Sequence, residues 1–527
     1  MPVPAMRLGP VARAIAFWGP TVAAAAAVAA VPPHTVDGPA HLLGGTVLAH
    51  WHTAPVYRQF YSLGWFPTPN LAAGLLLAGL IRLVGVGHAE TVLLVACVVA
   101  LPLALRWAIT AIRPAAGWTG VAALPFAFNY LYGYGFYNFC LGLALCLCCA
   151  GAALRAAPHW AAGPSARLGA LVVVTWFTHL VAFAVAIVFL AAVVACVRRP
   201  WGARPWLGPA VAVLPGLALT GAYLAHTSGG AAPRWSDPFP AAVGLVSLHT
   251  QLVTYRPAEN VVAGALAVAL SAIALATPRV GRGDARIRAV ALAGAGTAAL
   301  GLLAPESFGI AFGLIGERLS LFPVLFGLLW CFGRPIPRRW AAAGVAACLA
   351  ATAALGAVRL PELRREDRSA AEYLSAARYL RPGSTLIALR FAEFGPRAGR
   401  NRHFDPLRHL SSALAARTDS VDVGHYEAVL EYFPGRFRPD RDLRAAVDPG
   451  LGGLEQVPPR VDLPAAGRVG RIDYVLLIGA PQATGTAAAA LAATRAGLAR
   501  DYTMVGRTVP SGLVEVWAGT GGRAPGA

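Results

Sequence analysis

The chain has 527 residues, of which 57% are hydrophobic and 13% are charged. Soluble domains carry about 25% charged residues, so this composition excludes an ordinary soluble protein and indicates a polytopic membrane protein. The formal net charge of +19 comes from arginine, because the sequence contains no lysine. Many of these arginines flank apolar stretches, as membrane topology requires. We therefore interpret the charge as topological and expect no nucleic-acid partner.

Apolar stretches long enough to cross a hydrocarbon core, about 20 residues each, recur in the first two thirds of the chain. They predict an α-helical polytopic membrane protein with about 11 transmembrane helices. The predicted spans are 11–31, 70–87, 89–105, 117–131, 138–154, 168–197, 206–226, 259–277, 287–304, 319–333 and 340–358. The first span follows Arg7 and Arg13 and is long enough to cross, so we expect an uncleaved helix that begins in the cytoplasm.

Three short Arg-dense segments, 198–205, 279–288 and 333–340, predict cytoplasmic loops in the second half of this region. The first half fits this rule less well. Strict alternation from a cytoplasmic N-terminus places four further arginines outside: Arg106, Arg113, Arg155 and Arg167. Either a hairpin is hidden within 168–197, near Thr178 and His179, or these arginines break the rule.

Two domains follow from these patterns. Residues 1–358 form the transmembrane domain, with a first outer loop at 32–69, and residues 359–527 have the pattern of an extracytoplasmic α/β domain. Within this second domain the sequence predicts helices at 369–380 and 485–502, buried strands at 384–391 and 471–480, and a terminal β-hairpin.

The first outer loop contains the segment HTVDGPAHLLGGTVLAHW (34–51), which is typical of a short interfacial helix. Aromatic residues that could anchor this helix follow, namely Trp51, Tyr57, Tyr61 and Trp65. Asp37 precedes Gly-Pro, and two interpretations stay open: an N-cap of the helix, or a partly desolvated general base.

Four histidines surround Asp37: His34, His41, His50 and His52. The spacing of His50 and His52 turns them apart on a strand or a helix, which argues against one shared metal site. His41 is four residues from Asp37 and is the best candidate for a second catalytic group.

Several features together resemble the GT-C superfamily of integral membrane glycosyltransferases, which includes protein mannosyltransferases and aminoarabinose transferases. They are the first-loop Asp37, the aromatic turn FNYLYGYGFYNFCLGLALCL (128–147), the segment WFTHLVAF (176–183) and the C-terminal α/β domain. The resemblance implies a polyprenyl-phosphate sugar as donor and Asp37 as the residue that activates the acceptor hydroxyl. Many members carry a second acid that helps to bind metal, whereas Asp37 stands between Val36 and Gly38. A divalent metal is therefore left open. Glu306 and Asp237 could serve as a second acid, although their spacing does not show it.

Substrate-binding candidates lie in other loops. Arg318 could hold the donor phosphate or could pair with its neighbour Glu317, and Arg58 is a weaker candidate, as are Arg234 and Arg256. Tyr134 and Asn138, with the neighbouring tyrosines and Asn129, could line a sugar site or form an interfacial belt. His179 could be functional or could form a hydrogen bond within the bundle. Two polar and aromatic segments, 403–420 and 423–439, could bind an acceptor glycan or could be solvated surface.

The predicted function is transfer of a sugar to a cell-envelope glycan, lipid or protein acceptor on the outer face of a bacterial cytoplasmic (inner) membrane. The alternative is a non-catalytic membrane protein of the same fold, or a transporter or flippase of lipid-linked sugars. A transporter would be expected to pair polar spans as inverted repeats, and the sequence shows no such pairing.

Overall fold

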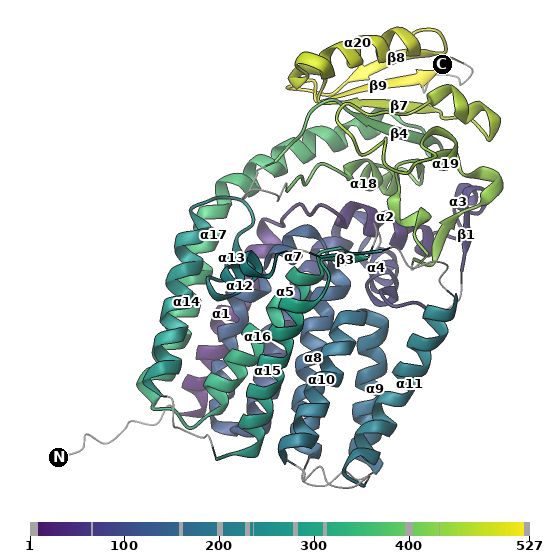
Figure 1. The fold of residues 1–527 in the computed structure, drawn as a ribbon. Coiled ribbons are helices and arrows are strands. Elements are labelled where there is room, and N and C mark those ends of the chain that lie inside the picture. The colour runs from purple at the N-terminus through teal and green to yellow at the C-terminus, as the bar shows by residue number, and fades with distance from the viewer. Residues whose placement is uncertain are drawn as a thin grey trace. The chain divides into compact units, whose positions relative to one another are not determined.

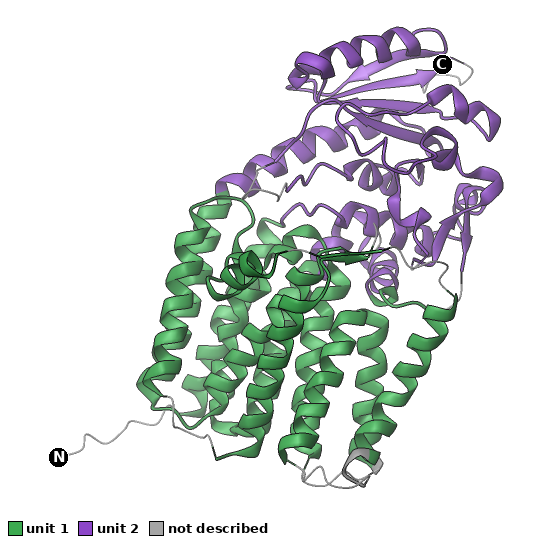
Figure 2. Ribbon diagram, viewed as in Figure 1, with its two compact units in different colours: residues 1–32, 67–72, 94–360 green, residues 33–66, 73–93, 361–527 purple. Residues whose placement is uncertain are grey.

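The computed structural model describes residues 9–64, 67–157, 162–197, 204–226, 232–235, 237–277, 283–308, 313–395, 404–431 and 433–520. Trp65 and most of the Arg-dense segment 198–205 lie outside these ranges. The chain divides into two compact units (Figure 2). Unit 1 comprises Met1–Pro32, Pro67–Ala72 and Leu94–Leu360, and unit 2 comprises Pro33–Phe66, Ala73–Leu93 and Pro361–Ala527. The first outer loop thus groups with the C-terminal residues.

Unit 1 is helical (Figure 1). Its elements are α1 (Pro10–Ala30), most of α5 (Val86–Ile112), η1 (Pro114–Ala123), α6 (Leu124–Ala127), α7 (Tyr130–Tyr134), α8 (Tyr137–Ala156), α9 (Ala162–Thr178), α10 (Leu180–Val197), α11 (Arg204–His226), α12 (Pro238–Val246), α13 (His249–Leu252), α14 (Glu259–Ala276), α15 (Ala285–Leu303), α16 (Ile315–Gly333) and most of α17 (Arg338–Leu374), with a two-residue ribbon of β2 (Pro233–Arg234) and β3 (Ser307–Phe308). Among the described residues, nine helices are long and apolar enough to cross a membrane. The protein is therefore a multi-pass membrane protein, as predicted.

Two predicted spans, 117–131 and 168–197, are each divided into more than one helix. The stretch 168–197 forms α9 and α10, with a break at His179, so the hidden hairpin is confirmed. The stretch 117–131 was predicted as one span, and this is wrong, because it forms η1, α6 and α7. Prolines begin η1 and α6, and a Cβ at Gly120 would lie 2.7 Å from Cα of Arg106. This close backbone approach accommodates a tight 3-10 path instead of a regular α-helix.

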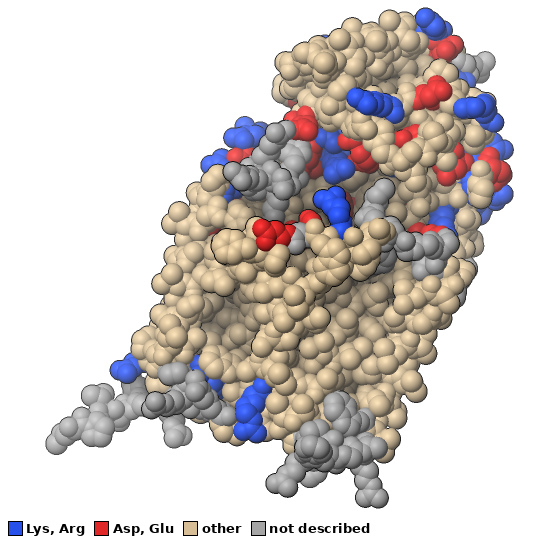
Figure 3. Space-filling model, viewed as in Figure 1, with Lys and Arg blue, Asp and Glu red and all other residues tan. Residues whose placement is uncertain are grey.

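Arginines gather at one end of unit 1. Arg13 donates to the carbonyl of Ala115 (3.5 Å), and Arg286 to that of Ala111 (3.2 Å). Arg113 donates to the carbonyl of Arg334 (2.8 Å). Figure 3 has the same view as Figure 2, in which unit 1 is green. It shows a broad band without charged residues across unit 1, with arginines at the lower end of the band.

Strict alternation had separated Arg113 from the Arg-dense loops, and the structure corrects this. The predicted span 70–87 is also wrong, because it forms α4 (Leu71–Val84), whose 14 residues are too few to cross a membrane, and α5 therefore returns the chain to the end where Arg113 meets Arg286 and Arg334. The division of 168–197 into two helices then keeps the later Arg-dense loops at this same end. Arg155 belongs to this end as well, since it donates to the carbonyl of Trp107 in α5 (2.8 Å).

Unit 2 is built on a five-stranded sheet with the strand order β5-β4-β7-β9-β8. The strands are β4 (Thr385–Arg390), β5 (Val421–Asp422), β7 (Tyr474–Ile478), β8 (Tyr502–Arg507) and β9 (Val514–Gly519). β4 runs parallel to β5 and β7, whereas β9 is antiparallel to β7 and β8. The two predicted strands and the terminal hairpin are thus confirmed. Every residue of β7 is buried, which explains its unbroken apolar sequence.

The remaining elements of unit 2 surround this sheet and the first outer loop. They are α2 (Gly38–Ala49), α3 (Pro55–Phe60), most of α4 (Leu71–Val84), the last turns of α17, η2 (Ser375–Tyr379), α18 (Leu410–Arg417), η3 (Tyr426–Val429), η4 (Pro439–Arg441), α19 (Leu443–Val447), η5 (Leu463–Arg468), η6 (Ala480–Gln482) and α20 (Gly485–Leu498), with β1 (Tyr61–Leu63) antiparallel to β6 (Gly435–Phe437). The helix predicted at 369–380 forms the end of α17 and η2, and the helix predicted at 485–502 is α20.

The packing of α2 positions the first outer loop. α2 packs against α18 and η3 within unit 2. A Cβ at Gly44 would lie 2.7 Å from Oε2 of Glu427, and a Cβ at Gly45 would lie 2.8 Å from Cβ of Leu77. Glycine at both positions therefore lets α2 approach its neighbours closely and brings Asp37 and His41 to the residues around 409–427.

Candidate functional site

The carboxylate of Asp37 does not cap α2. Asp37 occupies the N-cap position of the backbone, but its side chain makes no capping hydrogen bond. The backbone N–H of Gly38 donates instead to Oγ1 of Thr35 (3.1 Å), and this hydroxyl donates to Oε1 of Glu90 (3.1 Å). The capping interpretation is therefore wrong for this side chain, and the carboxylate is left for other interactions.

Asp37 lies in a nearly buried, polar environment. Its side chain is 13% exposed, and its Oδ1 is 3.7 Å from Nε2 of His409. The hydroxyl of Tyr426 donates a hydrogen bond to it. Burial raises the pKa of Asp37 to about 6, although the charges of His41 and Arg408 lower it. A carboxylate with this pKa is ionised at neutral pH and has a proton affinity close to the working pH, as a general base requires.

His41 is held as a cation by Glu427. Its Nδ1 forms an ion pair with Oε1 of Glu427, and both side chains are almost fully buried. Burial alone lowers the pKa of His41, but the charge and hydrogen bond of Glu427 raise it above its ordinary value. Burial likewise raises the pKa of Glu427, whereas His41 brings it down to about 2. Glu427 thus favours the protonated form of His41, whose positive charge lowers the pKa of Asp37.

His409 supplies a neutral ring beside the same carboxylate. Burial, together with the neighbouring Arg408, lowers the pKa of His409 to about 3, although Glu455 opposes this change. The ring also packs on that of Tyr426, with centroids 4.9 Å apart. The sequence had marked the segments that contain His409, Tyr426 and Glu427 only as polar and aromatic, without a role for any single residue.

The other first-loop histidines bind different acids. His34 Nε2 is 3.3 Å from Oδ1 of Asp367, and His50 Nδ1 is 2.7 Å from Oδ1 of Asp419. Within the described ranges, no three His, Cys, Asp or Glu side chains are arranged to hold a metal ion. The described residues therefore offer no donor set for a metal.

Arg58 donates hydrogen bonds to the backbone just before its own helix, α3. Its Nη1 donates to the carbonyls of Trp51 (2.9 Å) and His52 (3.1 Å) at the end of the first-loop segment. The guanidinium therefore closes the turn between α2 and α3. Its role in substrate binding stays a prediction.

Two predicted residues, Arg318 and Tyr134, contact the ring of Phe136 in unit 1, and two more, His179 and Asn138, belong to the same unit. The guanidinium of Arg318 lies 4.7 Å from the centre of that ring and interacts electrostatically with His179. The ring of Tyr134 packs against Phe136 at 5.1 Å. Asn138, two residues further on, donates to the carbonyl of Asn70 (2.8 Å). An arginine, a histidine and aromatic faces thus lie together at the N-terminal ends of α8 and α16.

Asn129 has a local structural role. Its Oδ1 accepts from the backbone of Tyr132 (3.0 Å), and its Nδ2 donates to the carbonyl of Phe126 (2.8 Å). These bonds cap α7 and fix the aromatic turn, which accounts for Asn129 without a bound sugar.

No protein-family model and no curated protein matches the sequence. The structure is similar to that of ArnT from Cupriavidus metallidurans in a crystal structure with bound undecaprenyl phosphate. The TM-score is 0.55 at 12% identity, over 97% of this chain and 98% of that chain. The apo structure of the same protein has a TM-score of 0.49 at 14% identity, over 96% and 97% of the two chains. The likeness in the first comparison confirms the GT-C-like fold that the resemblance predicted.

Proposed function

We propose that this protein is a GT-C-type membrane glycosyltransferase that uses a polyprenyl-phosphate-linked sugar as its donor. The acceptor is a cell-envelope glycan, lipid or protein at the outer face of the cytoplasmic membrane. The fold similarity supports this class, because the similar ArnT structure holds undecaprenyl phosphate. The arginine-rich end of unit 1 supports the orientation, with that end in the cytoplasm and the C-terminal domain outside.

The observation that carries the proposal is the state of Asp37. Its carboxylate is relieved of helix capping by Thr35, is nearly buried and has a pKa of about 6. A purely structural carboxylate is ordinarily satisfied by several donors, which lower its pKa. A raised pKa beside fixed charges is instead characteristic of groups that transfer protons.

The reaction follows from these states. Asp37 accepts the proton of the acceptor hydroxyl while the acceptor oxygen forms a bond to the anomeric carbon of the donor sugar. The bond from that carbon to the phosphate oxygen breaks, and the polyprenyl phosphate leaves with the electron pair. His41, kept positive by Glu427, favours the ionised form of Asp37 before transfer. The neutral ring of His409 adds no competing charge.

Arg318 is the proposed cation for the donor phosphate. Guanidinium groups bind phosphate in bidentate fashion, and the rings around Arg318 limit its hydration. His179, Tyr134 and Asn138 are proposed to shape the same part of unit 1 for the donor.

The test is a complementation experiment in a strain that lacks the gene. The strain receives the intact gene, an Asp37→Asn copy or an Asp440→Asn copy, and mass spectrometry profiles its envelope glycans and glycolipids. Asp440 lies at the surface of unit 2 with its side chain 63% exposed, and serves as the matched control. We expect the intact and Asp440→Asn copies to restore a missing sugar and the Asp37→Asn copy to leave it about 100-fold or more reduced at equal protein abundance. Restoration by Asp37→Asn would instead favour a transporter or non-catalytic protein.

A further inference from the structure

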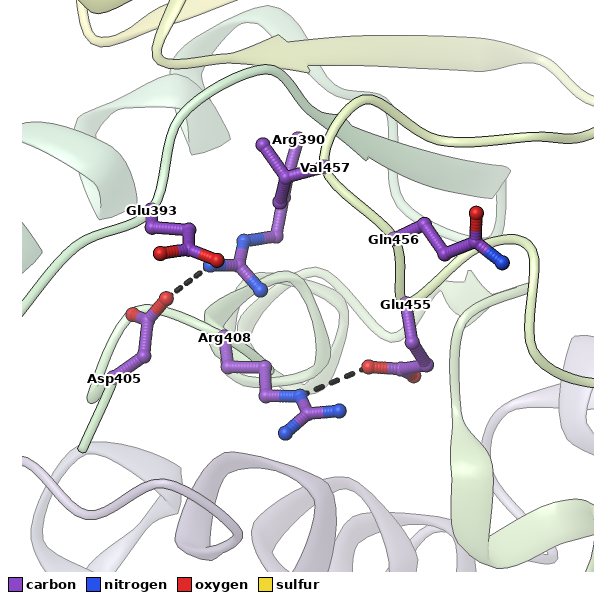
Figure 4. A pocket seen from close by; sticks show the side chains of 7 residues that line it. All are labelled: Arg390, Glu393, Asp405, Arg408, Glu455, Gln456 and Val457. Carbon is purple, nitrogen blue, oxygen red and sulfur yellow. Dashed lines mark hydrogen bonds and ion pairs between the residues drawn. The ribbon is translucent and has the colours of Figure 1, made fainter. Parts of the chain in front are cut away.

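A polar cavity of about 350 Å³ lies in unit 2 at the carboxyl end of β4 (Figure 4). Arg390 is the last residue of that strand. Seven residues line the cavity: Arg390, Glu393, Asp405, Arg408, Glu455, Gln456 and Val457. Ligands of α/β folds commonly bind outside the carboxyl ends of parallel strands, and the volume is within the range of small-molecule sites.

The charges of this cavity are balanced by one another. Arg390 forms an ion pair with Asp405, and Nε of Arg408 donates to Oε2 of Glu455 (2.9 Å). Oε1 of the same glutamate lies 3.5 Å from Arg444. The lining side chains therefore comprise two cations and three acids, as Figure 4 shows. A phosphate would meet these carboxylates as like charges, so the lining disfavours an anionic ligand.

The same groups suit a ligand rich in hydroxyls. Carboxylate oxygens accept several hydrogen bonds each, and guanidinium groups donate up to five, so groups already in ion pairs retain capacity for a ligand. Arg390 and its partner Asp405 are two such groups, and both line the cavity. Val457 is the one apolar residue among those that line the cavity, and a prenyl chain would find little apolar surface there.

Two consecutive residues, Arg408 and His409, connect the cavity to the candidate base Asp37. Arg408 lines the cavity, and its charge lowers the pKa of Asp37. His409, the next residue, has its Nε2 3.7 Å from Oδ1 of Asp37. A group bound in the cavity therefore lies next to the segment that contacts Asp37.

We propose that this cavity binds an uncharged, polyhydroxylated sugar unit of the acceptor. The proposal rests on the proposed transferase function and names the chemistry of its acceptor. A sugar could in principle come from the donor instead. The two sources differ at the anomeric carbon, which carries a phosphate in the donor and an ordinary glycosidic oxygen in an acceptor glycan.

The experiment is saturation-transfer NMR on the full-length protein in nanodiscs. The probes are the methyl glycosides of arabinose, galactose, glucose and mannose, the corresponding sugar 1-phosphates, and inorganic phosphate as a competitor. Gln456→Trp enlarges a side chain at the wall of the cavity without breaking an ion pair, and Gln482→Trp, at an exposed position of η6, is the matched control. We expect at least one methyl glycoside to show a signal that Gln456→Trp reduces at least threefold and Gln482→Trp leaves unchanged.

Each other outcome overturns the acceptor site. Absence of a signal from every methyl glycoside, or an equal signal in Gln456→Trp, would show that the cavity binds no sugar of this kind. Stronger binding of the 1-phosphates would assign the cavity to the donor, and displacement by inorganic phosphate would make it an anion site. The result is separable from the proposed function, because Asp37→Asn is expected to abolish transfer and to keep the methyl glycoside signal. Binding together with full transfer by Asp37→Asn would overturn the catalytic proposal alone.

Discussion

Two buried carboxylates of this protein, Glu259 in unit 1 and Asp37 in unit 2, have contrasting surroundings. Glu259 accepts backbone N–H bonds from Thr254, Tyr255 and Arg256, each at 2.9 Å. Its Oε2 also accepts from Nε (3.1 Å) and Nη2 (2.9 Å) of Arg359. Asp37 accepts one hydrogen bond from Tyr426 and has a histidine nitrogen at 3.7 Å.

The difference supports a structural role for Glu259 and the proposed catalytic role for Asp37. Arg359 also donates to the carbonyls of Phe128 (2.7 Å) and Leu252, so Glu259 and Arg359 together join three segments of unit 1. Five donors hold that carboxylate in one place. Asp37 is less fully satisfied, and burial has raised its pKa into the range where it exchanges protons. Exchanging each acid for its amide should therefore have opposite consequences.

The largest expected effect on stability is that of Glu259→Gln. Removal of one partner leaves Arg359 as an uncompensated buried charge, which costs about 3–5 kcal/mol of unfolding free energy. Unfolding of the detergent-solubilised protein, followed by tryptophan fluorescence, measures this loss.

In the same unfolding measurement, Asp37→Asn should not lose stability as Glu259→Gln does. Because the pKa of Asp37 is raised on folding, the folded state favours its protonated form. The resulting cost to stability is absent below pH 3.8 and is complete once the pH exceeds about 6. At pH 7 Asp37→Asn should therefore keep or increase stability. A loss as large as that of Glu259→Gln would assign Asp37 a structural role.

Much of the fold could be predicted because it follows from local patterns. The apolar spans, the buried strand around Tyr474–Ile478 and the terminal hairpin each carry their signal within one short stretch. The stretch 117–131 was mispredicted because its apolar composition is that of a span, whereas close packing on Arg106 determines its backbone.

The candidate site could be predicted only in part. Asp37 and His41 stand out in the sequence as polar residues beside a membrane span. Glu427 reaches His41 only through the packing of η3 on α2, and no spacing in the sequence connects the two. The same holds for Thr35, whose hydroxyl replaces Asp37 as the helix cap.

The next effect concerns the pH dependence of transfer. In the wild type we expect kcat/KM to fall below pH 6, because Asp37 becomes protonated there and can no longer accept a proton. In Glu427→Gln, His41 loses the charge that raises its pKa, so Asp37 loses a neighbouring cation. The charge of Glu427 also raises the pKa of Asp37 directly, so its loss opposes this change, but this is a smaller effect than that of His41. The acid limb should then move to higher pH and lower kcat/KM at pH 6 by about threefold or more.

The measurement is a pH profile of sugar transfer in proteoliposomes. Glu431→Gln removes an exposed acid from the same segment and should leave the profile unchanged. An acid limb that stays in place in Glu427→Gln would show that His41 does not act on Asp37 through its charge.

The smallest expected effect tests why the side chain of Asp37 does not cap α2. Thr35→Val removes the hydroxyl that accepts from Gly38, which should cost about 1 kcal/mol of unfolding free energy. The same hydroxyl donates to Oε1 of Glu90, so Thr35→Val also removes a hydrogen bond from that carboxylate, at the start of the helix where Asp37 lies. Thr35→Val should therefore lower transfer several-fold beyond its effect on stability, whereas Thr35→Ser keeps the hydroxyl and should behave as the wild type. If both variants transfer equally well, the carboxylate does not depend on Thr35 for its freedom, and only its burial distinguishes it from an ordinary helix cap.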